Sequence, residues 1–318
     1  MEKENKFLQL DREVLKKLLK DHSTGHNIMW CTDNYSSYGK MYERKRSIDV
    51  ELISVIKPRV YKSRQAQIQR VRDKAEVFTP SWICNAQNNL IDESWFGRKD
   101  VFNTESDKSW ISRTDKIDFS DTEGYRWTDY VKLNRLEITC GEAPYITSRY
   151  DTVTGDYIEV KDRIGFLDRK LRIISENTNN IEEKWLEWSL EAVKSIYGFE
   201  YQGDSLFIAR VNILLDVMEY FEYMFNKEMD ISSVMEISDI ISWNVWQMDG
   251  LKFVVPGSCT EEKTVSDRGF LFEELFVEEQ VCGCPGCLKG DNTKHNGIYC
   301  KIMDWKTHKS ERYMDLIK

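Results

Sequence analysis

The sequence predicts a doubly wound α/β fold, and two observations carry this prediction. From Leu133 onward, short apolar runs alternate with amphipathic segments in the order strand, helix, strand, helix, strand, which is the pattern of a parallel sheet covered by helices. The chain also has 318 residues, of which 41% are hydrophobic. That is enough to bury the core of one large domain or of two smaller ones.

Periodicity places the elements of this alternation. Three short apolar runs are predicted strands: 133–138, 196–201 and a run near Val245. Three segments with apolar residues at helical spacing are predicted helices: 180–197, 205–225 and 231–241. The first two strands are separated by too many residues for a bare β–α–β unit, so residues 149–180 are predicted to be an insertion.

The segments outside the alternation are less regular. Four elements are predicted before it: a helix at 11–20, a strand at 50–60, an exposed helix or extended basic arm at 61–74, and a helix beginning at Thr79. Thr79 is the expected N-cap, and Pro80 takes the first helical position, where a missing amide donor costs nothing. Residues 103–129 have no clear period and are expected to form an insertion or a long loop. Two C-terminal strands, 302–305 and 313–317, are expected on either side of a polar turn.

Charge is distributed unevenly along the chain. The net charge of −9 argues against a protein that coats nucleic acid without specificity. Residues 40–74 nevertheless hold eleven Lys and Arg against four Asp and Glu, a balance of +7. Residues 261–279 hold seven acidic against two basic residues, a balance of −5. The first segment predicts either a phosphate-binding groove or a solvated helix face.

The cytoplasm is the expected compartment. The chain contains no apolar stretch long enough to span a bilayer, and its N-terminal residues lack the apolar core of a signal peptide. We therefore expect no membrane partner. Eight cysteines in such a chain are unlikely to form a disulfide framework. Four of them are scattered and are expected to be ordinary reduced residues: Cys31, Cys84, Cys140 and Cys259.

The other four cysteines predict a zinc site. Cys282, Cys284 and Cys287 form a Cys-x-Cys-x-x-Cys knuckle, and His295 and Cys300 follow it. Thiolates are good zinc ligands, and a tight knuckle with a fourth donor nearby satisfies tetrahedral geometry. Cys300 is the preferred fourth ligand and His295 the alternative. Four protein donors would make this a closed, structural site.

Two segments at predicted strand ends suggest a nucleotide-type cleft. Glu137, Cys140 and Gly141 lie at the end of the first strand and in the turn after it, and Glu200 ends the second strand. In an open α/β sheet such ligands bind at the carboxyl ends of the strands. A small-residue turn lets backbone amides approach the ligand, and a carboxylate at the next strand end can accept hydrogen bonds from ribose hydroxyls.

Four motifs in order resemble the gamma class of DNA adenine methyltransferases, which use S-adenosylmethionine (SAM). The motifs are Ala75-Glu-Val-Phe-Thr-Pro-Ser-Trp, Leu136-Glu-Ile-Thr-Cys-Gly-Glu-Ala, Tyr197-Gly-Phe-Glu and Met248-Asp-Gly-Leu. The resemblance implies a Rossmann-like SAM methyltransferase fold. It also implies a set of cofactor-binding residues: Phe78, Thr79, Pro80, Glu137, Cys140, Gly141, Glu200 and Asp249. Asp249 would contact the adenine of SAM, and Phe78, Thr79 and Pro80 its methionine part.

The chain departs from the family pattern at two places. Ala143 stands where the family has its second glycine in the SAM turn. The catalytic Asn/Asp-Pro-Pro-Tyr/Phe, which holds the amine of a flipped adenine, does not occur, although 313–317 resembles the strand leading into it. The catalytic residues are therefore unknown, and we leave open whether the protein is an enzyme.

These observations predict three regions and two alternative functions. The regions are an N-terminal extension with the basic segment (1–74), a methyltransferase-like core (75–258), and an acidic and Cys-rich segment with the C-terminal strands and the zinc site (259–318). The chain also resembles stand-alone restriction–modification subunit M proteins of phages and bacteria. The first function is transfer of a methyl group to adenine N6 in DNA, alone or with a second subunit. The alternative is an inactive methyltransferase-like module that binds DNA or a host defence protein.

Overall fold

A three-stranded parallel sheet lies at the centre of this mixed α/β protein. The computed structural model describes residues 9–74, 78–120, 122–260, 262–265 and 279–317. The sheet has the order β3-β4-β5 and consists of β3 (Arg135–Glu137), β4 (Ile196–Glu200) and β5 (Val245–Gln247). All three predicted strands of the alternation are present.

Four helices connect these strands. Between β3 and β4 the chain forms α5 (Phe166–Asn177) and α6 (Glu182–Lys194), and between β4 and β5 it forms α7 (Gly203–Phe225) and α8 (Ile231–Asn244). Three of them match predicted helices, whereas α5 lies in the predicted insertion. Helix α7 is buried along most of its length, because it packs against helices as well as against β4 and β5.

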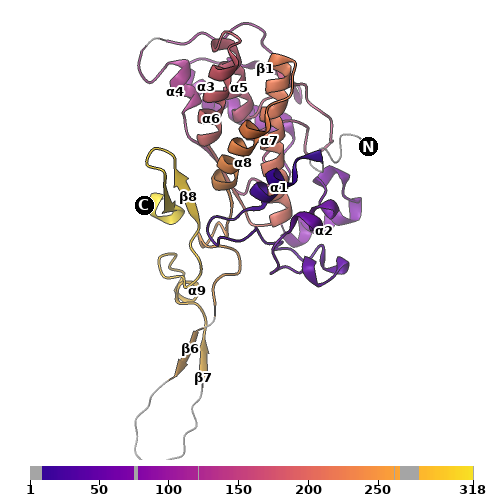
Figure 1. Cartoon of the computed structure of the whole chain (residues 1–318), viewed down its shortest axis with the longest axis vertical. Helices are drawn as coiled ribbons and strands as arrows, with labels where there is room; N and C mark the ends of the chain where they lie inside the picture. The colour runs from indigo at the N-terminus through magenta and orange to yellow at the C-terminus, as the bar shows by residue number, and fades with distance from the viewer. Residues whose placement is uncertain (1–8, 75–77, 121, 261, 266–278, 318) are drawn as a thin grey trace, which may run out of the picture.

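The N-terminal region shares the main hydrophobic core. Helix α1 (Arg12–Leu19) begins after Asp11, whose side chain accepts a hydrogen bond from the amide of Glu13. The apolar side of α1 is buried in the same cluster as α7 and α8. Figure 1 shows α1 beside these two helices, although the three segments are far apart in the sequence. The helix predicted at 11–20 is therefore confirmed.

The strand predicted at 50–60 is wrong. This segment forms two 3-10 helices, η4 (Val50–Val55) and η5 (Arg59–Tyr61), on either side of Pro58. Ile53 is the one buried residue of the first, so the alternating burial that a strand requires is missing. The basic arm is α2 (Arg64–Lys74).

The helix predicted from Thr79 begins two residues later. Helix α3 (Ser81–Phe96) has Pro80 at its N-cap position. Thr79 lies outside the helix, and its carbonyl accepts a hydrogen bond from the hydroxyl of Thr152 at 3.1 Å. Pro80 cannot donate an amide hydrogen bond, so it sits at the boundary without cost.

Two regions expected to be irregular or extended contain other elements. The predicted loop 103–129 holds a hairpin of β1 (Asn103–Ser106) and β2 (Ser109–Ser112) and the start of α4 (Trp127–Val131). The strand predicted at 313–317 is wrong, because Tyr313–Leu316 forms the helical turn α10. There the ring of Tyr313 packs on Trp246, with ring centroids 4.9 Å apart.

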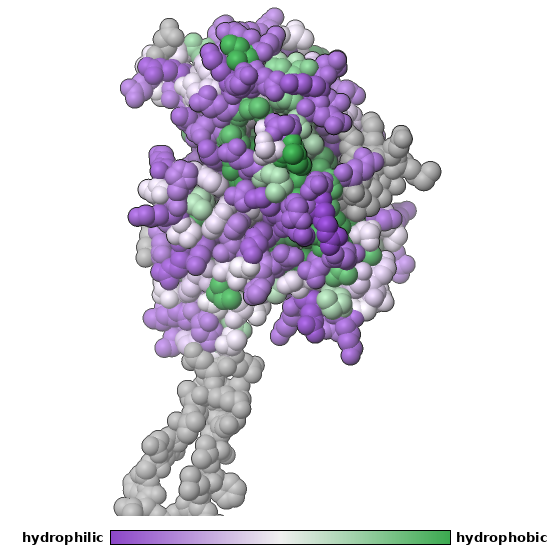
Figure 2. Space-filling view, viewed as in Figure 1, coloured by the Kyte–Doolittle hydropathy of each residue, from purple (hydrophilic) through white to green (hydrophobic). Residues whose placement is uncertain are grey.

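The remaining short elements lie around the core and in the C-terminal segment. They are η2 (Ser36–Tyr38), η3 (Lys40–Tyr42), η6 (Val160–Asp162), β6 (Glu262–Val265), β7 (Glu279–Cys282), α9 (Pro285–Lys289), β8 (Lys301–Asp304) and β9 (Lys309–Arg312). The hairpin of β6 and β7 extends away from the body in Figure 1. Hydrophilic residues cover most of the face shown in Figure 2. No helix in the described ranges is long and apolar enough to span a membrane.

One buried guanidinium joins several of these elements. Arg210 of α7 has no exposed surface, and burial lowers its pKa to about 10. Its guanidinium donates hydrogen bonds to four backbone carbonyls: those of Leu18 at 2.7 Å, Lys20 at 2.8 Å, Ser242 at 3.0 Å and Val245 at 2.7 Å. These acceptors belong to the end of α1 and the residue that follows it, the end of α8 and the start of β5.

We predict that Arg210→Met lowers the free energy of unfolding by about 3 kcal/mol or more, because buried carbonyls would lose their donor. Arg12→Met is the control, since Arg12 pairs with Glu51 at the surface and such pairs contribute about 0–1 kcal/mol. Urea unfolding followed by circular dichroism measures both variants. Equal losses in the two would contradict the role given to Arg210.

Candidate functional site

A cleft opens at the carboxyl ends of β3 and β4. It has a volume of about 510 Å³ and lies over the turn that follows β3. Six of the eight residues predicted from sequence to bind a cofactor line it: Phe78, Thr79, Glu137, Cys140, Gly141 and Glu200. Its volume is in the range of small-molecule and cofactor sites. The cleft is therefore the principal candidate site.

The turn after β3 adopts an unusual backbone conformation. Thr139, Gly141 and Ala143 have φ values of 48°, 54° and 66°, a left-handed region that favours glycine. The turn is closed by a hydrogen bond from the amide of Ala143 to the carbonyl of Cys140 at 2.7 Å. Ala143 thus occupies a conformation for which glycine is the usual choice, and its side chain is fully buried.

Glu200 ties the two strand ends together. Its carboxylate accepts hydrogen bonds from the amides of Gly141 at 3.0 Å, Tyr201 at 2.9 Å and Gln202 at 3.1 Å. Amide donors stabilise the ionised form of a carboxyl group. Glu200 can therefore present a carboxylate to the cleft while it holds the β3 turn against the start of α7.

Glu137 is a second carboxyl group in the cleft, with a different environment. Burial raises the pKa of Glu137 to about 8, although the amides of Tyr145 and Ile146 donate to it at 3.4 Å and 3.1 Å. The charge of Glu200 raises the pKa further. Burial thus favours the protonated form of Glu137, which can donate a hydrogen bond.

Two arginines lie at or near the cleft, each beside an aromatic side chain. The guanidinium of Arg59 stacks on the ring of Phe78 at 4.8 Å. Arg44 lines the cleft and donates a hydrogen bond to the hydroxyl of Tyr201 at 3.1 Å. Sequence analysis did not single out either arginine, although both belong to the basic segment 40–74. Arg44 therefore brings a positive charge to the cleft, and Arg59 brings one to the side of Phe78.

Other basic residues of that segment point into the protein. Lys62 and Arg70 both form ion pairs with the buried carboxylate of Asp204, at 3.0 Å and 2.8 Å. These two cations lower the pKa of Asp204 despite its burial. The predicted basic segment is therefore partly structural, and only part of its charge lies at the cleft. The acidic segment 261–279 falls largely outside the described residues.

Two predicted residues do not reach the cleft. Pro80 lies just beyond its wall, at the start of α3. Asp249 accepts a hydrogen bond from the amide of Leu251 at 3.1 Å and pairs with Lys252 at 3.8 Å, so it stabilises its own turn. Asn212 and Asn244 do not line the cleft either. The side-chain oxygen of Asn212 accepts a hydrogen bond from Arg149 at 3.2 Å, and that of Asn244 accepts one from the indole of Trp305 at 2.8 Å.

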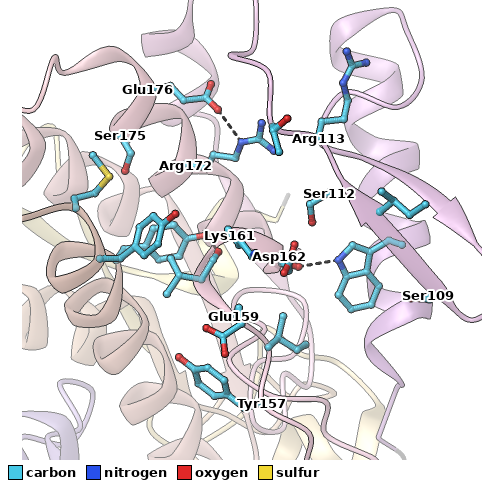
Figure 3. Close-up of a pocket in the computed structure, with 18 residues that line it drawn as sticks. Ser109, Ser112, Arg113, Tyr157, Glu159, Lys161, Asp162, Arg172, Ser175 and Glu176 are labelled. Carbon is cyan, nitrogen blue, oxygen red and sulfur yellow. Dashed lines mark hydrogen bonds and ion pairs between the residues drawn. The ribbon is translucent and has the colours of Figure 1, made fainter. Parts of the chain in front are cut away.

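A larger cavity, of about 920 Å³, lies between β2, η6, α5 and α7. Figure 3 shows two polar contacts between residues that line it. Arg172 pairs with Glu176 at 2.8 Å, and the indole of Trp110 donates to the carbonyl of Asp162 at 2.8 Å. This cavity contains none of the residues that the motifs indicate, so we place the candidate site in the smaller cleft.

A second candidate site is a cluster of three cysteines and one histidine. The donor atoms of Cys259, Cys284, Cys287 and His295 all lie within 4.8 Å of one another. The Nδ1 atom of His295 is 3.7, 3.4 and 3.6 Å from the sulfurs of Cys259, Cys284 and Cys287. A Cys₃His set of this kind can hold a metal ion such as zinc.

The surroundings of the cluster orient its ligands. The other ring nitrogen of His295 lies 3.3 Å from the side-chain oxygen of Asn292, which would leave Nδ1 to face the sulfurs. The amide of Asn296 donates to the sulfur of Cys284 at 3.3 Å. A Cβ on Gly286 would lie 2.6 Å from His295, so only glycine fits beside the histidine.

The expected zinc ligands need correction. Cys300 is not in the cluster: it is buried in a hydrophobic core and donates to the carbonyl of Gln247 at 3.3 Å. His295, the alternative, takes its place. Cys259, expected to be an ordinary reduced residue, is the additional member of the cluster. Cys282 ends β7, but its side chain lies outside the part of the chain that the structure describes.

Comparisons with protein-family models, with curated proteins and with solved structures found no match. The functional reading of both sites therefore depends on their motifs and geometry.

We predict that Glu137 makes the folded protein less stable as the pH rises from about 4.5 to about 8. The folded state holds the proton up to about pH 8, whereas an unfolded carboxyl releases it near 4.5, so the stability present at low pH is lost across this window. Glu137→Gln cannot ionise and removes this loss. Chemical unfolding of both proteins from pH 4 to 9 measures it, and a pH-independent difference between them would contradict the prediction.

Proposed function

We propose that the cleft binds SAM and that the protein is of the DNA adenine methyltransferase type. The observation that carries the proposal is the convergence of motifs on one cleft. The resemblance assigns cofactor binding to three segments that are far apart in the sequence, around Phe78, Gly141 and Glu200. All three segments line the cleft. A coincidental set of motifs would have no reason to meet at one strand edge.

The chemistry of the cleft is compatible with a nucleoside cofactor. Glu200 is a carboxylate at the end of β4, where it can accept hydrogen bonds from ribose hydroxyls. The turn from Thr139 to Ala143 presents backbone at the end of β3. The cations of Arg44 in the cleft and of Arg59 beside Phe78 favour an anionic partner such as DNA. Restriction–modification, in bacteria or phages, is the setting that the resemblance implies.

We predict that Glu200→Ala weakens SAM binding roughly tenfold or more, because hydrogen bonds to a carboxylate contribute about 1.5–3 kcal/mol each. Isothermal titration calorimetry with SAM measures the change. Glu191→Ala, which removes a surface partner of Lys194, is the control for loss of a glutamate. Glu200→Gln keeps the shape of the side chain and separates loss of charge from collapse of the turn. Equal affinities in all four proteins would exclude Glu200 as a ribose ligand.

Methyl transfer is tested separately from binding. In a complete enzyme, side-chain and backbone acceptors would hold the target amine, and this sequence contains no Asn-Pro-Pro-Tyr/Phe. The alternative function is therefore a methyltransferase-like module that binds DNA or a host defence protein without catalysis. Incorporation of label from tritiated SAM into adenine of phage and host DNA, with and without neighbouring gene products, distinguishes the two. SAM binding without incorporation favours the module.

The Cys₃His cluster binds one structural Zn²⁺ in this proposal. Its ligands come from both sides of the β6–β7 hairpin: Cys259 precedes β6, and the other three follow β7. A metal ion would therefore close the base of this hairpin. Four protein donors leave no open position for a substrate, which makes the site structural.

We predict about one zinc per chain in protein purified without chelator, measured by mass spectrometry of the metal. Cys287→Ser should lose the zinc, because a hydroxyl is a poor ligand for it. Cys300→Ser should keep the zinc, since Cys300 lies in a separate core. Loss of metal in Cys300→Ser as well as in Cys287→Ser would restore the ligand set expected from sequence.

A further inference from the structure

The central sheet has an open edge at β3. Strand β4 pairs with one side of β3, and no strand in the described ranges pairs with the other. The amide of Arg135 donates to Ser195 on the β4 side, so alternation along the ladder turns the amide and carbonyl of Leu136 to the open side. An edge of this kind is a template for another strand.

Apolar side chains lie along this edge. Leu136 is 42% exposed and Ile138 66% exposed. Arg135 of β3 reaches helix α3, where it forms an ion pair with Asp92. The buried side of α3 is mostly polar, whereas Leu90 and Ile91 are 66% and 44% exposed. A cavity of about 680 Å³ between α3 and β3 is lined by Leu90, Ile91 and Arg135, among others. Exposed apolar residues gathered in this way indicate a binding surface.

Among the described residues that line the cavity, Arg135 is the only charged one. Asp92 of α3 faces two guanidiniums: it forms an ion pair with Arg169 and lies 3.6 Å from Arg135. One carboxylate between two guanidiniums leaves one net positive charge. Asp92 also accepts a hydrogen bond from the hydroxyl of Tyr130 at 2.7 Å, and the Nη2 atom of Arg135 has no hydrogen-bond acceptor among the described residues. An acidic group in this cavity would balance the charge.

We infer that the open edge of β3 and the exposed side of α3 bind an extended segment of a second polypeptide. This segment adds a strand beside Leu136, with apolar side chains at alternate positions and an acidic side chain toward Arg135. Backbone hydrogen bonds supply the pairing, and the cavity supplies selectivity for the acidic residue. The inference does not rest on the proposed cofactor.

The position of the edge gives the second polypeptide access to the cleft. The carboxyl end of β3 leads into the turn at Thr139, and Ile138 lines the cleft itself. A strand that runs parallel to β3 would therefore end at the cleft opening. Residues that follow the added strand could then reach a molecule bound there.

Synthetic peptides test this inference with the full-length protein. The probe is a nine-residue peptide that alternates valine with polar residues and has one central aspartate. One control peptide has asparagine in place of aspartate, and another has a central proline. Hydrogen–deuterium exchange of residues 133–140 reports strand addition, and fluorescence anisotropy reports affinity. The aspartate peptide should bind more tightly than the asparagine peptide and slow exchange at β3, and the proline peptide should do neither.

Variants locate the binding surface. Leu136→Lys should abolish both signals, because an edge lysine opposes pairing. Arg135→Gln should lower the affinity for the aspartate peptide roughly tenfold, to that of the asparagine peptide, because it removes a charged hydrogen bond. Ile111→Lys is the matched control, since Ile111 is 68% exposed on β2, and it should bind like the native chain. Equal binding of all three peptides, unchanged exchange at β3, or a native dimer that Leu136→Lys dissociates would overturn the inference.

Discussion

The guanidinium of Arg210 is the interaction on which the rest of the fold depends. It joins α1, α7, α8 and β5 through four backbone carbonyls. A buried guanidinium is stable only when its donors have acceptors, and the carboxyl ends of helices offer carbonyls with partial negative charge. The position of β5 against α7 follows, and with it the place of β4, whose last residue is Glu200. The geometry of the cleft therefore depends on a contact at the amino-terminal end of the sheet, whereas the cleft lies at the carboxyl ends of the strands.

A second polar network fixes the turn after β3, which lines the cleft. Arg149 donates to Asn212 at 3.2 Å and to Glu219 at 2.6 Å, both on α7. Asn212 donates to the carbonyl of Glu142 at 3.0 Å, and the side chain of Glu142 accepts from the amide of Arg59 at 2.6 Å. The left-handed turn after β3 is thus held between α7 and the N-terminal region. A preformed turn is what a backbone-lined binding site requires, because it need not be ordered when the ligand arrives.

The Cys-rich segment is attached to the sheet by its own small core. Cys300, Ile302 and Trp246 belong to this core, together with Phe199 of β4, and the amide of Cys300 donates to the carbonyl of Phe253 at 3.1 Å. The Cys₃His cluster is therefore connected to β4 and β5 through this core. This arrangement separates two cysteines that are close in sequence: Cys287 belongs to the cluster, whereas Cys300 packs in the core.

The sequence by itself determined the alternation of strands and helices, and it identified Phe78, Gly141 and Glu200 as residues of one cleft. Local periodicity and motif order carry this information. Only the tertiary structure decided that Cys259 and His295, rather than Cys300, complete the cysteine cluster, because burial in a core formed by distant strands competes with metal ligation. The tertiary structure also decided that residues 50–60 and 313–316 form short helical segments where strands were predicted. Short apolar segments fit a strand or a helix equally well, and the surfaces against which they pack settle which one forms.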